Sequence, residues 1–258
     1  MTELPKHGPM NCRLCWGDHE GKTERLLDER RFRLVNDPGA WGSSNPIVLV
    51  LGQTKGNTQS SEMQNILSRG VFDQVAFKRF RPNLLKVLKA VGVLDHTPSV
   101  DPLLTDSEPN FGWGSVVRCS MTGLDEKTGE YSGDSGKVLP AYKAKEAQVV
   151  ILTCMQKWLK DLPERNKLIV LLGNSDLYIR RMREKLRKVH PDTLPHPQAP
   201  NVAHLAAGRT WVHVGHPSGA NGHLTNFLHD YERSGQGKKR ADARRAVRYE
   251  LDRIATNW

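Results

Sequence analysis

The chain has 258 residues, 38% of them hydrophobic, and a formal net charge of +10. Short apolar runs spread along this length can bury one good core, so we expect one folded domain, or two small ones. No apolar run approaches the length of a membrane span, and the N-terminus lacks the apolar segment of a secretion signal, which indicates an intracellular, cytoplasmic protein. The charge favours a polyanionic partner such as nucleic acid, because Lys and Arg contacts with phosphates release bound counterions.

In chain order, short runs rich in Leu and β-branched residues predict buried strands, and segments with apolar residues at helical spacing predict helices between them. The predicted strands are 45–53, 113–119, 167–174 and 209–214, and the predicted helices are 81–93, 141–162, 175–189 and 238–254. Three polar or proline-rich segments, 125–136, 190–200 and 234–239, are expected to be exposed loops.

Strands that alternate with helices are typical of an α/β fold, and here they predict a three-layer αβα sandwich around a mostly parallel, doubly wound sheet. In such sheets ligands bind beyond the carboxyl ends of the strands. The chain places turn-forming and polar residues at these ends, and we expect them to converge on one site. They are Gly52 to Asn57, Ser115, Gly173 to Ser175 and His216 to Ser218.

The chain has four cysteines, and in a reducing compartment these favour metal ligation over disulfides. Cys12 and Cys15 form the motif CRLC, whose two-residue spacing lets one turn present two thiolates to a metal. Cys119 ends a predicted strand and Cys154 lies within a predicted helix, so folding must bring the four together. The set fits a Cys₄ zinc site or a [4Fe–4S] cluster, while ordinary buried cysteines account for Cys119 and Cys154 taken singly.

These motifs, in this order, resemble those of the uracil-DNA glycosylase superfamily, particularly its iron–sulfur branches, over the chain from Cys12 to about Leu228. VLVLGQTKG resembles the first active-site loop of the family, AFKRFRPNLL the segment whose phenylalanine stacks on the flipped base, and GHPSG the His-Pro-Ser loop. CRLC, SVVRCSM and the helix before LIVLLGN resemble the segments that carry the cluster cysteines.

The resemblance implies a uracil-DNA-glycosylase-like fold and a monomeric DNA glycosylase. Such an enzyme flips a pyrimidine nucleotide out of DNA and hydrolyses its N-glycosidic bond, which leaves an abasic site. It also implies a structural [4Fe–4S] cluster, with zinc as the alternative, bound by Cys12, Cys15, Cys119 and Cys154.

The resemblance further implies a role for each residue at the carboxyl edge. His216 would donate a hydrogen bond to the base oxygen as negative charge develops on the leaving base. Gln53 or Thr54 would position the attacking water, and Phe77, with Phe72 as the alternative, would stack on the base. The expected base-binding residues are Gly52, Lys55, Asn57 and Ser115. The expected DNA-binding residues are Pro217, which stiffens the turn, Ser218, which holds a phosphate, and Asn221 and Leu224, within the 220–224 segment that fills the vacated space in the duplex.

Two positions depart from the pattern of the family. Lys55 stands where proline is usual, and the first loop holds no carboxylate to orient water. Ser115 stands where an asparagine would read the edge of uracil, and a hydroxyl cannot offer the paired donor and acceptor of a carboxamide. We therefore predict a larger modified pyrimidine, such as glucosylated hydroxymethylcytosine of phage DNA, contacted by Lys55, Asn57 and Ser115, and a role in antiviral defence. Ordinary uracil repair and a non-catalytic binder of modified DNA are the alternatives.

The domain prediction divides the chain into a catalytic domain, 1–232, with the four-cysteine cluster, and a basic C-terminal helical extension, 233–258, because the resemblance fades after Leu228. The basic helices 175–189 and 238–254 are more typical of solvated faces than of DNA contacts. His190, His196 and His204 lack the spacing of a catalytic metal site, and we expect them in surface loops.

Overall fold

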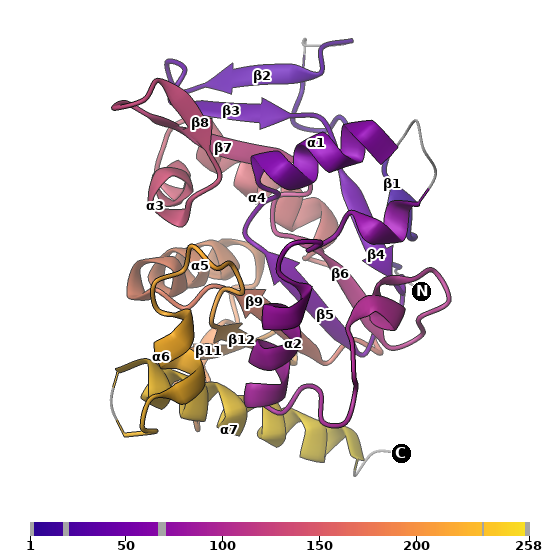
Figure 1. The fold of residues 1–258 in the computed structure, drawn as a ribbon, viewed down its shortest axis with the longest axis vertical. Coiled ribbons are helices and arrows are strands. Elements are labelled where there is room, and N and C mark those ends of the chain that lie inside the picture. The colour runs from indigo at the N-terminus through magenta and orange to yellow at the C-terminus, as the bar shows by residue number, and fades with distance from the viewer. Residues whose placement is uncertain (1–2, 18–20, 67–70, 234, 256–258) are drawn as a thin grey trace.

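The computed structural model describes residues 3–17, 21–66, 71–233 and 235–255, and its fold is α/β. The outermost residues of the two predicted domains (1–2 and 256–258), and Ser234 in one predicted loop, lie outside the described residues. Figure 1 shows a central sheet with helices on both faces, a small second sheet at one end of the long axis and helix α7 at the other.

The centre of the main sheet consists of four parallel strands in the order β6-β5-β9-β12. They are β5 (Val48–Gly52), β6 (Phe111–Ser115), β9 (Leu168–Leu172) and β12 (Arg209–Val214). Strands β5 and β9 were predicted from their apolar runs and β12 from its alternation, whereas the strand predicted at 113–119 is strand only to Ser115.

Antiparallel strands, which were not predicted, extend this sheet on both sides, so the eight-stranded sheet of the described residues is mixed around its parallel centre. These strands are short, and one lies in the proline-rich segment that was expected to be a loop. The turn between β11 and β12 takes Ala207 and Gly208 to φ values of 50° and 70°, as a two-residue hairpin requires. The added strands are β1 (Gly8–Pro9), β4 (Gly39–Gly42), β10 (Leu194–Pro195) and β11 (Ala203–Ala206).

Alternate side chains of the central strands enter two separate apolar cores, which gives the predicted three layers. On one face, Leu49, Ile169 and Trp211 pack with α4 and α5. On the other face, Val50, Val170 and neighbouring side chains pack with α2, α6 and α7. The helices are α1 (Asn57–Ile66), α2 (Arg81–Ala90), α3 (Ser135–Val138), α4 (Ala147–Trp158), α5 (Asp176–Val189), α6 (Leu224–His229) and α7 (Gly235–Ala255), with short 3₁₀ turns at Phe72–Gln74, Asp101–Leu104 and Leu139–Tyr142.

A second, antiparallel sheet of four strands was not predicted. Its strands are short, and β8 lies in the polar 125–136 segment that was expected to be an exposed loop. Leu27, Phe32 and Met121 extend the first apolar core into it. The sequence had indicated that Cys119 ends the strand at 113–119. In the structure β6 ends at Ser115, and Cys119 immediately precedes β7. The strands are β2 (Glu24–Leu27), β3 (Phe32–Val35), β7 (Ser120–Asp125) and β8 (Glu130–Ser132).

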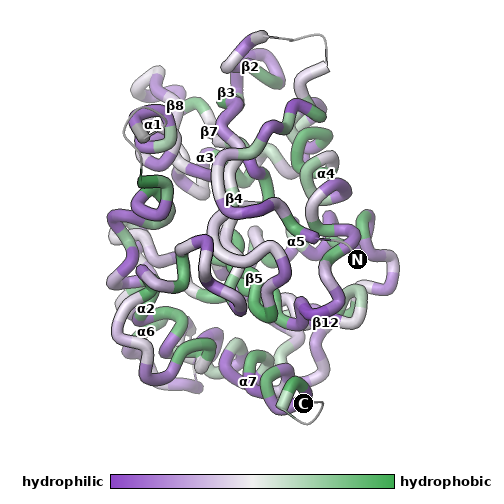
Figure 2. The backbone as a smooth tube through the Cα atoms, turned by 90° about the vertical axis from the view of Figure 1, so that its right-hand side faces the viewer, coloured by the Kyte–Doolittle hydropathy of each residue, from purple (hydrophilic) through white to green (hydrophobic). Residues whose placement is uncertain are grey.

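The predicted C-terminal helix exists as α7, and it is part of the fold and not an appendage. Ala243, Ala246 and Val247 are buried in the second core, and Thr210 Oγ1 in β12 donates a 2.6 Å hydrogen bond to Glu250. Figure 2 shows that both hydrophilic and hydrophobic residues occur along α7. The helix thus covers the sheet with its apolar side. No helix among the described residues has the length and apolar character that crossing a membrane requires.

The packing of α7 can be tested by truncating one of its buried side chains. Val247→Ala is expected to lower the free energy of unfolding by about 2 kcal/mol, because it removes buried methyl groups and leaves a cavity. Arg244→Ala on the exposed side of the same helix is the control and is expected to change it by less than about 0.5 kcal/mol. Urea unfolding measures both, and equal effects would show that α7 does not pack on the core.

Candidate functional site

The parallel register brings the carboxyl ends of the central strands to one edge of the sheet. Gly52 pairs with Ser115, and the Val116 amide donates to the Gly52 carbonyl at 2.9 Å. The Gly173 amide donates to the Val214 carbonyl at 2.8 Å, which joins the end of β9 to the end of β12. Because β6 and β9 lie on opposite sides of β5, the chain reverses its winding between β5 and β9. In open α/β sheets ligands bind at such a switch point.

The loop after β12 carries His216 to this edge and is held by its own hydrogen bonds. The Ser218 amide donates to His216 Nδ1 at 3.2 Å, so in the neutral ring the proton resides on Nε2. Burial lowers the pKa of His216 to about 4. Asn221 Nδ2 donates to the His216 carbonyl at 2.9 Å, and Asn83 Nδ2 in α2 donates to the Pro217 carbonyl at 3.2 Å. The imidazole is therefore a fixed, neutral donor at pH 7.

Three aromatic residues near α2 differ in their surroundings. Phe77 is 8% exposed, packs with its ring centroid 5.9 Å from that of Trp113 and has a φ of 55°, which is uncommon for a residue with a side chain. Phe72 stacks on Trp41. Phe80, which was not among the predicted site residues, lies with its ring centroid 6.1 Å from that of His216. It belongs to the same AFKRFRPNLL motif, and only the turn before α2 decides which ring faces the histidine.

The side chains of the first loop are used to hold the loop in place. Thr54 Oγ1 donates to the Cys119 carbonyl at 3.0 Å and accepts from the Met121 amide at 2.7 Å. Lys55 is 2% exposed, donates to the Arg118 carbonyl and lies 3.4 Å from Asp37 Oδ1. These bonds contradict the predicted roles of Thr54 in water positioning and of Lys55 in base contact, because both polar groups are satisfied inside the protein.

Gln53 and Asn57 of the first loop differ in whether their side-chain hydrogen-bonding groups already have partners. Gln53 Nε2 is buried and has no hydrogen-bond partner among the described residues. It therefore remains the side chain of this loop with a donor to offer. Asn57, at the start of α1, donates to the Tyr131 carbonyl at 2.6 Å and accepts from Arg33 at 3.1 Å, so it supports the small sheet.

The end of β6 presents Ser115 next to Gly52. Its side chain is buried, and Oγ donates to the Val117 carbonyl at 2.6 Å. Because its proton is used in this bond, Ser115 Oγ can serve a ligand only as a hydrogen-bond acceptor.

The remaining predicted DNA contacts follow His216. Ser218 is half-buried, and its Oγ accepts from the Ala220 amide at 3.2 Å. Leu224 is 8% exposed and packs in the second core as the first residue of α6, so it is not available to enter a duplex, contrary to the prediction. Gly219, Ala220, Gly222 and His223 form the exposed part of this loop.

The third predicted segment of the edge, Gly173 to Ser175, has structural contacts. Asn174 Nδ2 donates to Gln236 at 2.7 Å, and Lys239 donates to the Asn174 carbonyl at 2.9 Å, so this segment anchors the start of α7. Ser175 caps α5 by accepting from the Tyr178 amide.

All four cysteines line one small cavity, as the sequence predicted. Arg118 and Trp158 share its wall, as do Leu14, Pro38 and Thr153. Burial raises the pKa of Cys15 to about 12, and burial raises the pKa values of Cys119 and Cys154 as well, so these thiols are protonated when no metal is bound. In the described part of the chain, no three His, Cys, Asp or Glu side chains are arranged to hold a single metal ion.

The histidines that were expected at the surface are buried. His190, His196 and His204 are at most 5% exposed, because they lie at the end of α5 or in the added strands and their turn. The His204 and His213 rings are 5.9 Å apart, and His213 Nδ1 donates to the Gly173 carbonyl at 2.8 Å. Burial lowers the pKa of His213 to about 4 and that of His204 to about 2, so both are neutral at pH 7.

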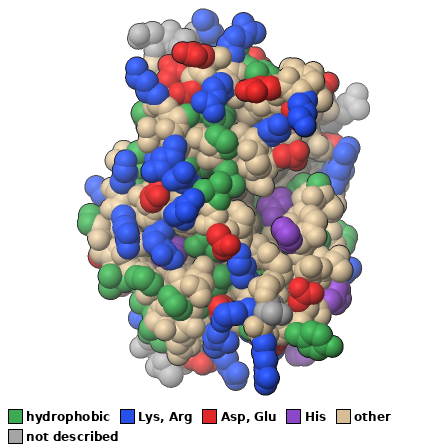
Figure 3. All heavy atoms as spheres, turned by 90° about the vertical axis from the view of Figure 1, so that its left-hand side faces the viewer, with side chains coloured by type: hydrophobic (Ala, Val, Ile, Leu, Met, Phe, Trp, Pro, Cys, Tyr) green, Lys and Arg blue, Asp and Glu red, His purple; other side chains and the backbone are tan. Residues whose placement is uncertain are grey.

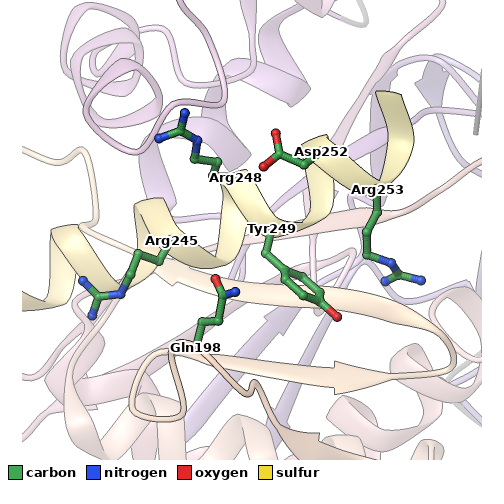
Figure 4. Close-up of a pocket in the computed structure, with 6 residues that line it drawn as sticks. All are labelled: Gln198, Arg245, Arg248, Tyr249, Asp252 and Arg253. Atoms are coloured by element: carbon green, nitrogen blue, oxygen red, sulfur yellow. The ribbon is translucent and has the colours of Figure 1, made fainter. Parts of the chain in front are cut away.

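Basic side chains are spread over the surface. Figure 3 shows Lys and Arg gathered on the face that includes α3, α5 and α6 at the left of Figure 1. A separate depression on α7 contains Gln198, Arg245, Arg248, Tyr249, Asp252 and Arg253 (Figure 4). Arg245 pairs there with Asp242, and Arg253 lies 3.2 Å from Glu250. Much of the positive charge of this depression is therefore neutralised within the helix.

A comparison with models of protein families finds no match to this chain, and a search of curated proteins finds none either.

The buried His213 makes the stability of the protein dependent on pH. Its pKa is about 4 in the fold and about 6.5 when exposed, so the unfolded chain binds more protons between these values. The free energy of unfolding is therefore expected to keep the full contribution of neutral His213 above about pH 6.5. It is expected to fall by up to about 3 kcal/mol towards pH 4 as this group becomes protonated in the unfolded chain. Urea unfolding across this range should show a flatter profile for His213→Phe. The exposed His229→Phe is the control, and identical slopes in the two variants would contradict the assignment.

The neutral state of His216 can be measured directly. In an NMR titration its ring signals, assigned by their loss in His216→Asn, are expected to shift with a midpoint near pH 4, because burial disfavours the imidazolium ion. A midpoint near 6.5 would show that this ring is solvated and that the loop does not hold it as described.

Proposed function

We propose that this protein is a DNA glycosylase that extrudes a pyrimidine nucleotide and hydrolyses its N-glycosidic bond. The observation that carries the proposal is the placement of His216: a neutral imidazole with its proton on Nε2, held in a turn at the carboxyl edge of the sheet. Phe80 beside it offers an aromatic face, and the backbone around Gly219 and Ala220 is exposed. The net charge of +10 suits a DNA partner.

In this reaction the electron pair of the N-glycosidic bond leaves with the base, the oxygen of water becomes bonded to the sugar carbon, and the proton that water loses neutralises the released base. Negative charge develops on the pyrimidine oxygen, and the Nε2–H of His216 stabilises it by a hydrogen bond that needs no reorganisation. A neutral imidazole holds its Nε2 proton too tightly to transfer it, so the ring acts as a hydrogen-bond donor and not as an acid. Gln53 Nε2, buried and without a partner among the described residues, is the side chain of the first loop that we assign to water or base.

We infer that the base belongs to the cytosine class. Ser115 Oγ can only accept a hydrogen bond, and the exocyclic amine of cytosine is a donor, whereas the corresponding oxygen of uracil is an acceptor. Glucosylated hydroxymethylcytosine remains the proposed substrate. Lys55 does not contact the base in this proposal, because its ammonium group is buried against Asp37.

The four cysteines are proposed to hold a [4Fe–4S] cluster, with zinc as the alternative. The fit rests on four sulfur donors around one cavity and on Arg118, whose buried Nε and Nη1 have no hydrogen-bond partners among the described residues. A cluster bound there would link the N-terminal segment, the bend before β7 and helix α4, which is a structural function.

A non-catalytic binder of modified DNA is the second candidate. The observation that favours it is the first loop, where Thr54 and Lys55 are committed to internal contacts and no carboxylate is present to orient water. Ordinary uracil repair is the remaining alternative within the same chemistry.

Base release from matched duplexes tests the reaction and the base together. Duplexes with glucosylated hydroxymethylcytosine are expected to lose their base faster than duplexes with uracil, by roughly tenfold or more, the scale of one good base contact. Ser115→Ala is expected to slow the first reaction and leave the second unchanged, because only the first uses the acceptor. Faster release of uracil would support uracil repair, and tight binding without release of either base would support the binder.

The cofactor can be identified on purified protein. We expect visible absorption of protein-bound iron–sulfide, with iron and sulfide in equal amounts, and its loss in Cys154→Ser because one of the four ligands is removed. Zinc without sulfide would establish the alternative, and neither metal in protein prepared without oxygen would overturn the proposed cofactor.

A further inference from the structure

Arg118 is a buried cation in the wall of the cysteine cavity. It lies in the bend between β6 and β7, immediately before Cys119, and is 2% exposed. Its side chain lines the same cavity as the four cysteines. A guanidinium so far from water is costly unless an opposite charge or several acceptors surround it.

The described residues do not supply that compensation. Nε and Nη1 of Arg118 are buried without a hydrogen-bond partner among them. The carboxylate of Asp37 already has other partners. Its oxygens accept hydrogen bonds from the Ser120 amide and hydroxyl, each at 2.7 Å, and one of them lies 3.4 Å from Lys55 Nζ.

The sheet makes room for this guanidinium in a specific way. A Cβ atom at Gly114 in β6 would lie 1.9 Å from Arg118 Nη1, so the position of the guanidinium depends on a glycine there. The main chain of Arg118 is fixed too, since the Arg118 carbonyl accepts a hydrogen bond from Lys55 Nζ. The side chain therefore has a defined location beside the sulfurs, and its unmet donors belong to that location.

Four thiolates around a metal centre in this cavity would balance this charge. A [4Fe–4S] core of charge 2+, or one zinc ion, leaves a net charge of 2− when four thiolates bind it. We propose that Arg118 is the counter-ion of the thiolate-bound centre and a hydrogen-bond donor to its sulfurs. This inference rests on the proposed cofactor, and it adds a positioning residue that lies outside the four ligands.

Two consequences can be measured without any assay of base release. Reduction adds negative charge to a cluster, so a neighbouring cation favours the reduced state and raises the reduction potential. The same cation stabilises the bound centre, and loss of a partner outside the ligand set typically weakens metal binding by roughly 10- to 100-fold.

The experiment compares Arg118→Met with the exposed Arg180→Met as the matched control, both in the full chain loaded as it is isolated. Arg118→Met is expected to move the midpoint potential to a more negative value and to lose its metal to a chelator roughly tenfold faster than the wild type. Arg118→Lys should recover part of both effects because it restores the charge. Gly114→Ala, which leaves the charge but displaces the guanidinium, should give an intermediate result and serves if Arg118→Met fails to fold.

The outcomes separate this inference from the proposed cofactor. A wild-type protein with neither iron–sulfide nor zinc overturns both. A wild-type protein with a cluster, together with an Arg118→Met variant whose potential and metal loss equal those of Arg180→Met, overturns the counter-ion role alone. If the wild type contains zinc, the rate of metal loss decides the question in the same way.

Discussion

The parallel pairing of β5 with β6 and with β9 is the constraint on which the candidate site depends. It aligns the ends of strands that lie about 120 residues apart in the chain, so that Gly52, Ser115 and the loop after β9 meet at one edge. The pairing of β9 with β12 then adds His216. Both faces of these strands are covered by apolar cores, and a shift of register would disrupt both at once.

One short segment, from Arg118 to Met121, serves two parts of the molecule. Its side chains face the cysteine cavity through Arg118 and Cys119, and its backbone groups hold Thr54 and Lys55 of the first loop. Whatever fixes the cavity therefore also fixes the loop beside the sheet edge. The proposed metal centre at the cysteines and the position of the first loop would therefore depend on the same set of contacts.

Much of the central fold was predictable from the sequence, because β5 and β9 are apolar runs that end at a glycine, β12 alternates, and the helices have apolar residues at helical spacing. The convergence of the four cysteines was also predictable, since each stands in a segment that resembles a cysteine-bearing segment of the iron–sulfur glycosylases. The short antiparallel strands were not, because two to four residues of alternating polarity give little periodic signal. Thr54 was assigned to water, Lys55 to the base and Leu224 to the duplex from their positions in motifs, yet tertiary contacts turn their side chains inward. Phe80 was not predicted as a site residue, because Phe77 is the residue that matches the motif. The turn before α2 nevertheless directs Phe80, and not Phe77, to His216.

The central claim is that a neutral imidazole at the edge of the sheet stabilises the charge of a departing base. The most direct measurement is the single-turnover rate of base release by His216→Ala, together with its affinity for the same duplex. The account predicts a loss of at least about 100-fold in rate, the scale of one preorganised donor, with affinity largely retained. An unchanged rate, or a parallel loss of affinity and rate, would contradict it.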